Sequence, residues 1–158
     1  MQAIVKDACT QAGIELELKA VTAAVFFGSD VANPDTFQKF WADMQMFATF
    51  MVSPDPQGLL ADFRTENIAQ KSNKWSSANR LRWSNAEFDA LSETLRIEFD
   101  PVKRAALAIQ LNDLLVSDGY VIPLFGRTRM TGVINKLNPV LSAWDSDLWM
   151  LGYWTRDS

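Results

Sequence analysis

Residues 80–125 carry most of the information about the fold. They contain Arg80-Leu-Arg-Trp-Ser-Asn-Ala-Glu-Phe-Asp-Ala-Leu91, then Asp100-Pro-Val-Lys-Arg-Ala-Ala-Leu107, then Asp118-Gly-Tyr-Val-Ile-Pro-Leu-Phe125. Ser84 and Glu87 have the spacing of a capping box, in which each side chain bonds the backbone N–H of the other residue. The first stretch therefore predicts a helix that starts just after Ser84. The apolar stripe of this helix would consist of Phe88, Leu91, Leu95 and Phe99.

Asp100 and Pro101 predict the start of a second helix. Aspartate accepts backbone N–H bonds at the N-cap, and proline in the first turn loses no hydrogen bond. Gly119 predicts its end, since glycine readily adopts the left-handed conformation that often follows a helix. The apolar residues of this second helix are Val102, Ala105, Ala106, Ile109, Leu111, Leu114 and Leu115. Residues 120–125 then predict a short strand, with Pro123 at an edge or a bulge.

The rest of the chain alternates between helical and strand patterns. Helices are expected at residues 2–12, 22–27 (or a turn there), 33–40 and 59–63, and strands at residues 14–18, 43–50 and 127–134. Residues 53–58 include two prolines and a glycine and must turn, whereas residues 64–79 lack periodicity and predict a loop. Helices followed by strands at this spacing are typical of α/β architecture.

Composition excludes several classes of protein. The 158 residues are enough for one domain with a core, and the net charge of −4 argues against a nucleic-acid-binding surface. No apolar run approaches the roughly 20 residues that span a bilayer. The chain has no histidine, and its single cysteine, Cys9, is expected to be a buried thiol. We therefore expect no enzymatic activity, no cofactor and no metal site.

Five pieces of the sequence, taken in order, resemble the C-terminal part of the family 5 extracellular solute-binding proteins. These are the large binding components of ABC importers for oligopeptides, dipeptides, nickel and some sugars. The matching pieces are Ala12-Gly-Ile-Glu-Leu-Glu-Leu18, Trp41-Ala-Asp-Met-Gln-Met-Phe47 followed by Ser53-Pro-Asp-Pro56, Arg82-Trp-Ser-Asn-Ala-Glu-Phe-Asp89, Asp100-Pro-Val-Lys-Arg-Ala105, and Asp118-Gly-Tyr-Val-Ile-Pro-Leu-Phe125.

The resemblance implies an α/β fold, namely part of the second lobe of a type II periplasmic binding protein, with a mixed sheet flanked by helices. Residues 1–134 would form this C-terminal lobe, incomplete because a strand before residue 2 is missing, and residues 135–158 would be a tail that returns to an absent first lobe. The chain would thus be a fragment of an exported protein in the periplasm or outside the cell. That protein would bind a peptide-like or sugar-like solute and present it to a membrane permease.

The first candidate site is the loop that leaves the expected strand at residues 43–50. Its candidate ligand-binding residues are Thr49, Phe50, Met51, Val52, Ser53 and Asp55. Ligands of α/β sheets gather beyond the carboxyl ends of strands. The resemblance implies that this loop lines the cleft, where peptide-binding members place an acidic residue against the free amino terminus of the ligand. Here Val52 occupies that place, which favours a neutral or differently charged solute. Alternatively, Ser53 and Asp55 only stabilise the turn through side-chain to backbone bonds.

A second candidate site combines Trp75, Arg80, Arg82 and Trp83. An arginine beside a tryptophan suits the recognition of a carboxylate or a sugar, through its planar guanidinium and the aromatic face. Arg82 and Trp83 are therefore candidate ligand-binding residues. Because Trp83 immediately precedes the predicted helix cap, we favour the alternative, in which this tryptophan anchors a loop to the core.

Two further expectations concern partners. An incomplete sheet and an aromatic tail expose unpaired backbone groups and apolar surface, so we expect a homo-oligomer formed through residues 135–158 or through the edge of the sheet. The alternative to a solute-binding protein is a self-standing protein-interaction module that uses the aromatic tail. A third class, a small hydrolase, would show turnover of model esters or peptides.

Overall fold

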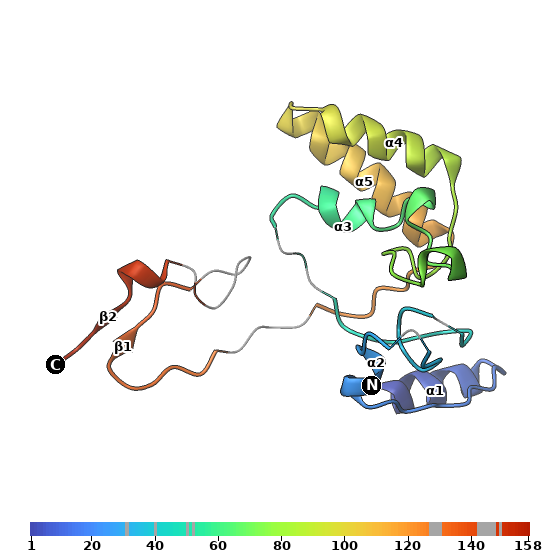
Figure 1. Ribbon diagram of the computed structural model, residues 1–158, viewed down its shortest axis with the longest axis horizontal. Coiled ribbons are helices and arrows are strands. Elements are labelled where there is room, and N and C mark those ends of the chain that lie inside the picture. The colour runs from blue at the N-terminus through green and yellow to red at the C-terminus, as the bar shows by residue number, and fades with distance from the viewer. Residues whose placement is uncertain are drawn as a thin grey trace. The chain divides into compact units, whose positions relative to one another are not determined.

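The computed structural model describes residues 1–30, 32–39, 41–49, 51, 53–126, 131–141, 148 and 150–158 (Figure 1). The chain divides into two compact units. Unit 1 comprises residues 1–48 and 65–84, and unit 2 comprises residues 49–64 and 85–158. Among the described residues, no helix is both long enough and apolar enough to cross a bilayer.

Unit 1 begins with helix α1 (Gln2–Gln11), as the sequence predicts. Its end is set by Gly13, which has a φ of +81°. The N–H of Gly13 bonds the carbonyl of Thr10, and the N–H of Ile14 bonds that of Cys9. This pair of bonds is the Schellman pattern that closes many helices. Cys9 is a free, half-buried thiol, so the expectation of a buried one is met only in part.

Unit 1 continues with the four-residue helix α2 (Ala23–Phe26) and two 3-10 turns, η1 (Thr65–Asn67) and η2 (Lys71–Asn73). The predicted helix at residues 33–40 is wrong, because the described residues there form turns; Phe40 lies outside them. Four phenylalanines, Phe26, Phe27, Phe37 and Phe47, pack with ring centroids 5.0–6.3 Å apart. The most buried side chains among the described residues of unit 1 are those of Ala69, Asn79 and Trp83.

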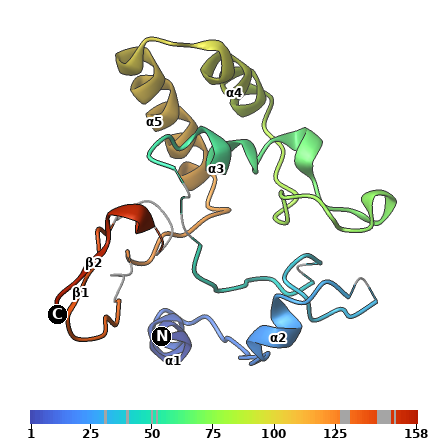
Figure 2. The ribbon, with the colours of Figure 1, turned by 60° about the vertical axis from the view of Figure 1, so that its left-hand side comes forward.

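In the described part of unit 2, helices α3 (Gln57–Ala61), α4 (Ala86–Ile97) and α5 (Pro101–Ser117) lie side by side in both ribbon views (Figure 2). Asp100 caps α5 as predicted, accepting N–H bonds from Val102 and Lys103. Gly119 follows the helix with a φ of +73°. The predicted capping box of α4 is wrong by one residue, because the side chain of Asn85 accepts the N–H bonds of Glu87 and Phe88.

The core of this helical part is smaller than the sequence predicts. Its buried apolar side chains are Leu60, Phe88, Leu95, Leu111 and Leu115. Phe99, predicted to end the apolar stripe of α4, lies beyond the helix and is 92% exposed. Val102 and Ile109 of α5 are also exposed. Of the apolar residues of α5, Leu111 and Leu115 are therefore buried, whereas Val102 and Ile109 are exposed.

Apart from an isolated parallel bridge between Ile68 and Asn79 in unit 1, strand pairing in the described residues is confined to the C-terminal tail. There β1 (Leu137–Asn138) pairs antiparallel with β2 (Thr155–Arg156), and the 3-10 turn η3 (Leu151–Tyr153) precedes β2. The strands predicted at residues 14–18 and 120–125, and the described parts of those predicted at 43–50 and 127–134, are irregular; Phe50 and residues 127–130 lie outside the described chain. The mixed sheet and the binding-protein lobe remain predictions.

Candidate functional site

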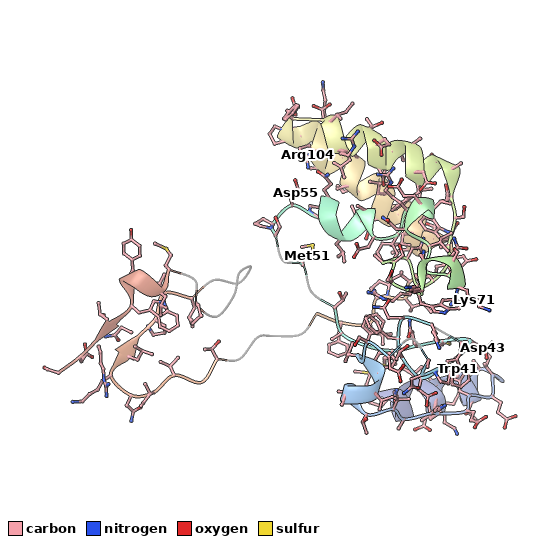
Figure 3. The ribbon with its side chains drawn as sticks, in the orientation of Figure 1. Trp41, Asp43, Met51, Asp55, Lys71 and Arg104 are labelled. Atoms are coloured by element: carbon pink, nitrogen blue, oxygen red, sulfur yellow. The ribbon has the colours of Figure 1, made fainter. Side chains whose placement is uncertain are left out.

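The described residues of the loop 49–55 lie outside the buried core. Thr49 is exposed, and Met51 and Ser53 are half-buried. The two other candidates in this stretch, Phe50 and Val52, lie outside the described residues. Figure 3 labels Met51 on the segment that leads toward α3, with Asp55 closer to that helix. The loop is thus accessible where the structure describes it.

Ser53 and Asp55 form the turn that starts α3. The Ser53 hydroxyl accepts a 3.2 Å hydrogen bond from the N–H of Asp55, and one carboxylate oxygen of Asp55 accepts a 2.9 Å bond from the N–H of Gln57. Short polar side chains favour such turns because they replace backbone acceptors locally. These are the bonds expected if Ser53 and Asp55 stabilise the turn. They leave the second carboxylate oxygen of Asp55 for another partner.

That partner is Arg104, a residue that sequence reasoning missed. Its guanidinium forms an ion pair with Asp55 and donates a 2.9 Å hydrogen bond to the side-chain oxygen of Gln57. Figure 3 shows the Arg104 side chain pointing toward Asp55. Arg104 lies in the first turns of α5, 49 positions from Asp55. No local pattern links residues so far apart in the sequence.

Electrostatics favour the ionised form of Asp55. The backbone hydrogen bond from Gln57 lowers the pKa of its carboxyl below 3.8, partial burial opposes this shift, and the hydrogen bond and charge of Arg104 lower the pKa further. Bonds to the charged form of an acid and a nearby positive charge both stabilise the carboxylate. Asp55 is therefore a carboxylate at neutral pH, with a protein partner on each oxygen.

The second candidate site belongs to unit 1. The Arg82 guanidinium lies 5.0 Å from the centre of the Trp75 ring and donates hydrogen bonds to the carbonyls of Ala69 and Lys39. Arg80 is similarly engaged, since its guanidinium lies 4.1 Å from the centre of the Phe37 ring. Through these contacts, Arg80 and Arg82 hold together irregular segments of unit 1.

The surroundings of Trp83 are those of an anchor, the role that the sequence favours. Its side chain is buried, and its carbonyl accepts a 2.8 Å hydrogen bond from the side-chain amide of Asn79, itself fully buried. A buried indole contributes a large apolar contact area. The candidate residues are therefore distributed over both units, with Thr49 to Asp55 in unit 2 and Arg82 and Trp83 in unit 1.

The described residues of unit 2 line at least two hollows. The first, between α3 and α4, has a volume of only about 20 Å³ and is lined by Leu60, Ser92 and Leu95 among others, so it holds no more than a water molecule. The second, of about 460 Å³, lies in the tail and is lined mainly by apolar residues, including Ile134, Leu148 and Trp154. Its size falls in the range of small-ligand sites.

The described residues contain no group of three or more acidic or cysteine side chains placed to hold a metal ion. Comparison with protein-family models, with characterised proteins and with solved structures found no match to this chain.

Proposed function

We propose that this protein is the solute-binding component of an ABC importer, which binds a peptide-like or sugar-like solute outside the cytoplasmic membrane and delivers it to a permease. The observation that carries the proposal is the loop 49–55, whose described part is accessible and whose end is held to α3 and α5 by Asp55. A binding loop needs this combination, because an accessible but fixed segment loses little entropy when a ligand binds.

The order of elements supports the same proposal. The α4–α5 pair forms where the sequence resembles the family, with Asn85 and Asp100 as caps. The loop 49–55 precedes these helices and leads directly into α3. This order is the one on which the resemblance to family 5 rests.

The proposed role is binding without catalysis. The chain has no histidine to act as a base at neutral pH. Ser53, the hydroxyl of the candidate loop, accepts a backbone N–H bond within its own turn. In binding proteins of this kind, specificity comes from complementary polar groups in a cleft that closes by domain motion.

The tail bears on the alternative, a self-standing interaction module. In such a module we expect the tail to be well docked. Instead Leu148, Leu151 and Tyr153 are exposed, the last of them to 70%. This exposure supports a tail that packs against another part of the binding protein. The apolar hollow of about 460 Å³, which tail residues line in part, is the feature that favours a protein partner.

Uptake measurements test the proposal. Cells in which the coding sequence is deleted should lose the import of at least one labelled peptide or sugar, and expression of the intact gene should restore it. The whole protein, purified from the cell envelope, should release a small solute on denaturation that mass spectrometry identifies. Unchanged uptake across peptide and sugar panels, together with a cytoplasmic location on fractionation, would contradict the proposal.

A further inference from the structure

Arg104, in the first turn of α5, makes hydrogen bonds with two other parts of unit 2 at once. One terminal nitrogen donates to the carbonyls of Leu95 and Glu98 at the end of α4, at 2.8 and 2.6 Å. The other donates to the side chains of Gln57 and Asp55 at the start of α3. The guanidinium of arginine presents its donors in a rigid plane, which suits a fixed group with several acceptors.

The bonds to α4 hold Arg104 in place independently of Asp55. The last carbonyls of a helix lack partners within the helix and carry partial negative charge, so they bind a cation well. The side chain of Arg104 is also more buried than that of Asp55, with exposed fractions of 21% and 47%. The positive charge is therefore a permanent part of this site, and Asp55 approaches it from the loop.

Asp55 is the acidic residue of the candidate loop, and both of its carboxylate oxygens are bonded within the protein. Its charge is balanced by that of Arg104. A primary ammonium group on a solute would have to displace the guanidinium or share the carboxylate with it. Both are unfavourable, because the ammonium loses its strong hydration and meets a like charge.

We infer that Arg104 determines specificity in the proposed solute site: by pairing with Asp55 it makes the loop 49–55 electrically neutral toward the solute and selects solutes whose amino group is absent or acylated. This inference rests on the proposed function, and it names the class of solute. It also assigns Asp55 an indirect role, since Asp55 neutralises Arg104 and does not itself bind the solute.

Two matched pairs of probes test it by calorimetry at about pH 6, where free amino groups are protonated. The pairs are trialanine with N-acetyltrialanine and glucosamine with N-acetylglucosamine. The whole protein as the cell makes it should bind the acetylated member of at least one pair more tightly. In Arg104→Gln, the ratio of affinities should shift toward the free amine by about tenfold, the size expected for a new charge-assisted hydrogen bond. Arg104→Lys should keep most of the original preference.

Two further variants separate this role from a structural one. Adding Asp55→Asn to Arg104→Gln should cancel the shift, because the carboxylate that would bind the amine is gone. Asp55→Asn alone leaves the bonds of Arg104 to α4 intact and should strengthen the preference for the acetylated probe. This variant keeps the test decisive if Arg104→Gln does not fold.

Each remaining outcome overturns a different statement. Binding with an affinity ratio that is the same in the wild type and in all folded variants would overturn the role of Arg104 and leave the proposed function standing. No binding of any of the four probes by the wild type would overturn this inference, and the uptake measurements described above would then decide the proposed function separately.

Discussion

The side-chain amide of Asn79 donates a 2.8 Å hydrogen bond to the backbone carbonyl of Trp83, and both side chains are buried. The backbone of Asn79 is also bonded, with its N–H donating to Asn67 and its carbonyl accepting from Ala69. Buried polar groups need such partners because water is excluded from them. Asn79 and Trp83 therefore hold together residues 65–84 of unit 1, which are irregular apart from the short turns η1 and η2.

Replacing Trp83 should be among the most damaging changes in the chain. Its side chain is 2% exposed, so Trp83→Ala should lower the free energy of unfolding by about 3–5 kcal/mol. Trp41→Ala is the matched control, because Trp41 is 56% exposed and its ring contacts the ammonium of Lys19. It should cost less than about 1 kcal/mol. Denaturant unfolding followed by circular dichroism measures both, and equal losses would contradict the anchoring role.

The start of α4 offers a comparison between adjacent residues. Asn85→Ala removes the side chain that accepts two backbone N–H bonds and should lower the free energy of unfolding by about 1 kcal/mol. Ser84→Ala removes only an exposed hydroxyl that bonds Thr65 and should cost less than about 0.5 kcal/mol. If thermal or denaturant unfolding shows the reverse order, the cap lies at Ser84.

Acid should destabilise the protein partly through Asp55. The folded state lowers the pKa of this carboxyl below 3.8, chiefly through the Gln57 N–H and then Arg104, so the folded state favours the ionised form. The resulting stability is complete well above pH 3.8 and is lost as the pH falls through the lowered pKa. As the pH falls from about 6 to about 2, the free energy of unfolding should therefore decrease less in Asp55→Asn than in the wild type. If the free energy of unfolding depends on pH in the same way in both proteins, Asp55 does not contribute to the acid sensitivity.

Self-association should depend on the tail. Leu148, Leu151 and Tyr153 are exposed apolar side chains, and such surface favours contacts between copies. Sedimentation should detect a species larger than the monomer, and Leu151→Lys combined with Tyr153→Ser should shift it toward the monomer. The control is Val102→Lys with Ile109→Lys on α5, where apolar side chains are equally accessible. A wild type that stays monomeric at high concentration argues against the expected homo-oligomer.

The boundaries of α1 and α5 could be predicted because they depend on neighbouring residues. Asp100 and Pro101 start α5, and Gly13 and Gly119 take the left-handed conformation just beyond α1 and α5. Each of these signals acts within a few residues through backbone geometry or a local hydrogen bond. The sequence predicts the cap of α4 at Ser84, one residue too early, because serine and asparagine both cap helices well and either position suits the same helix.

Burial and pairing were decided by tertiary structure. Val102, Ile109 and Phe99 fit an apolar pattern but are exposed. A sequence pattern shows which residues share a helix face, but it does not show which part of the protein packs against that face. The alternating residues 14–18 likewise predict a strand, but a strand requires a partner for its backbone groups. The pair of Asp55 with Arg104 spans 49 positions. It forms only because α3, α4 and α5 pack together, which brings a loop carboxylate to a guanidinium already held by the end of α4.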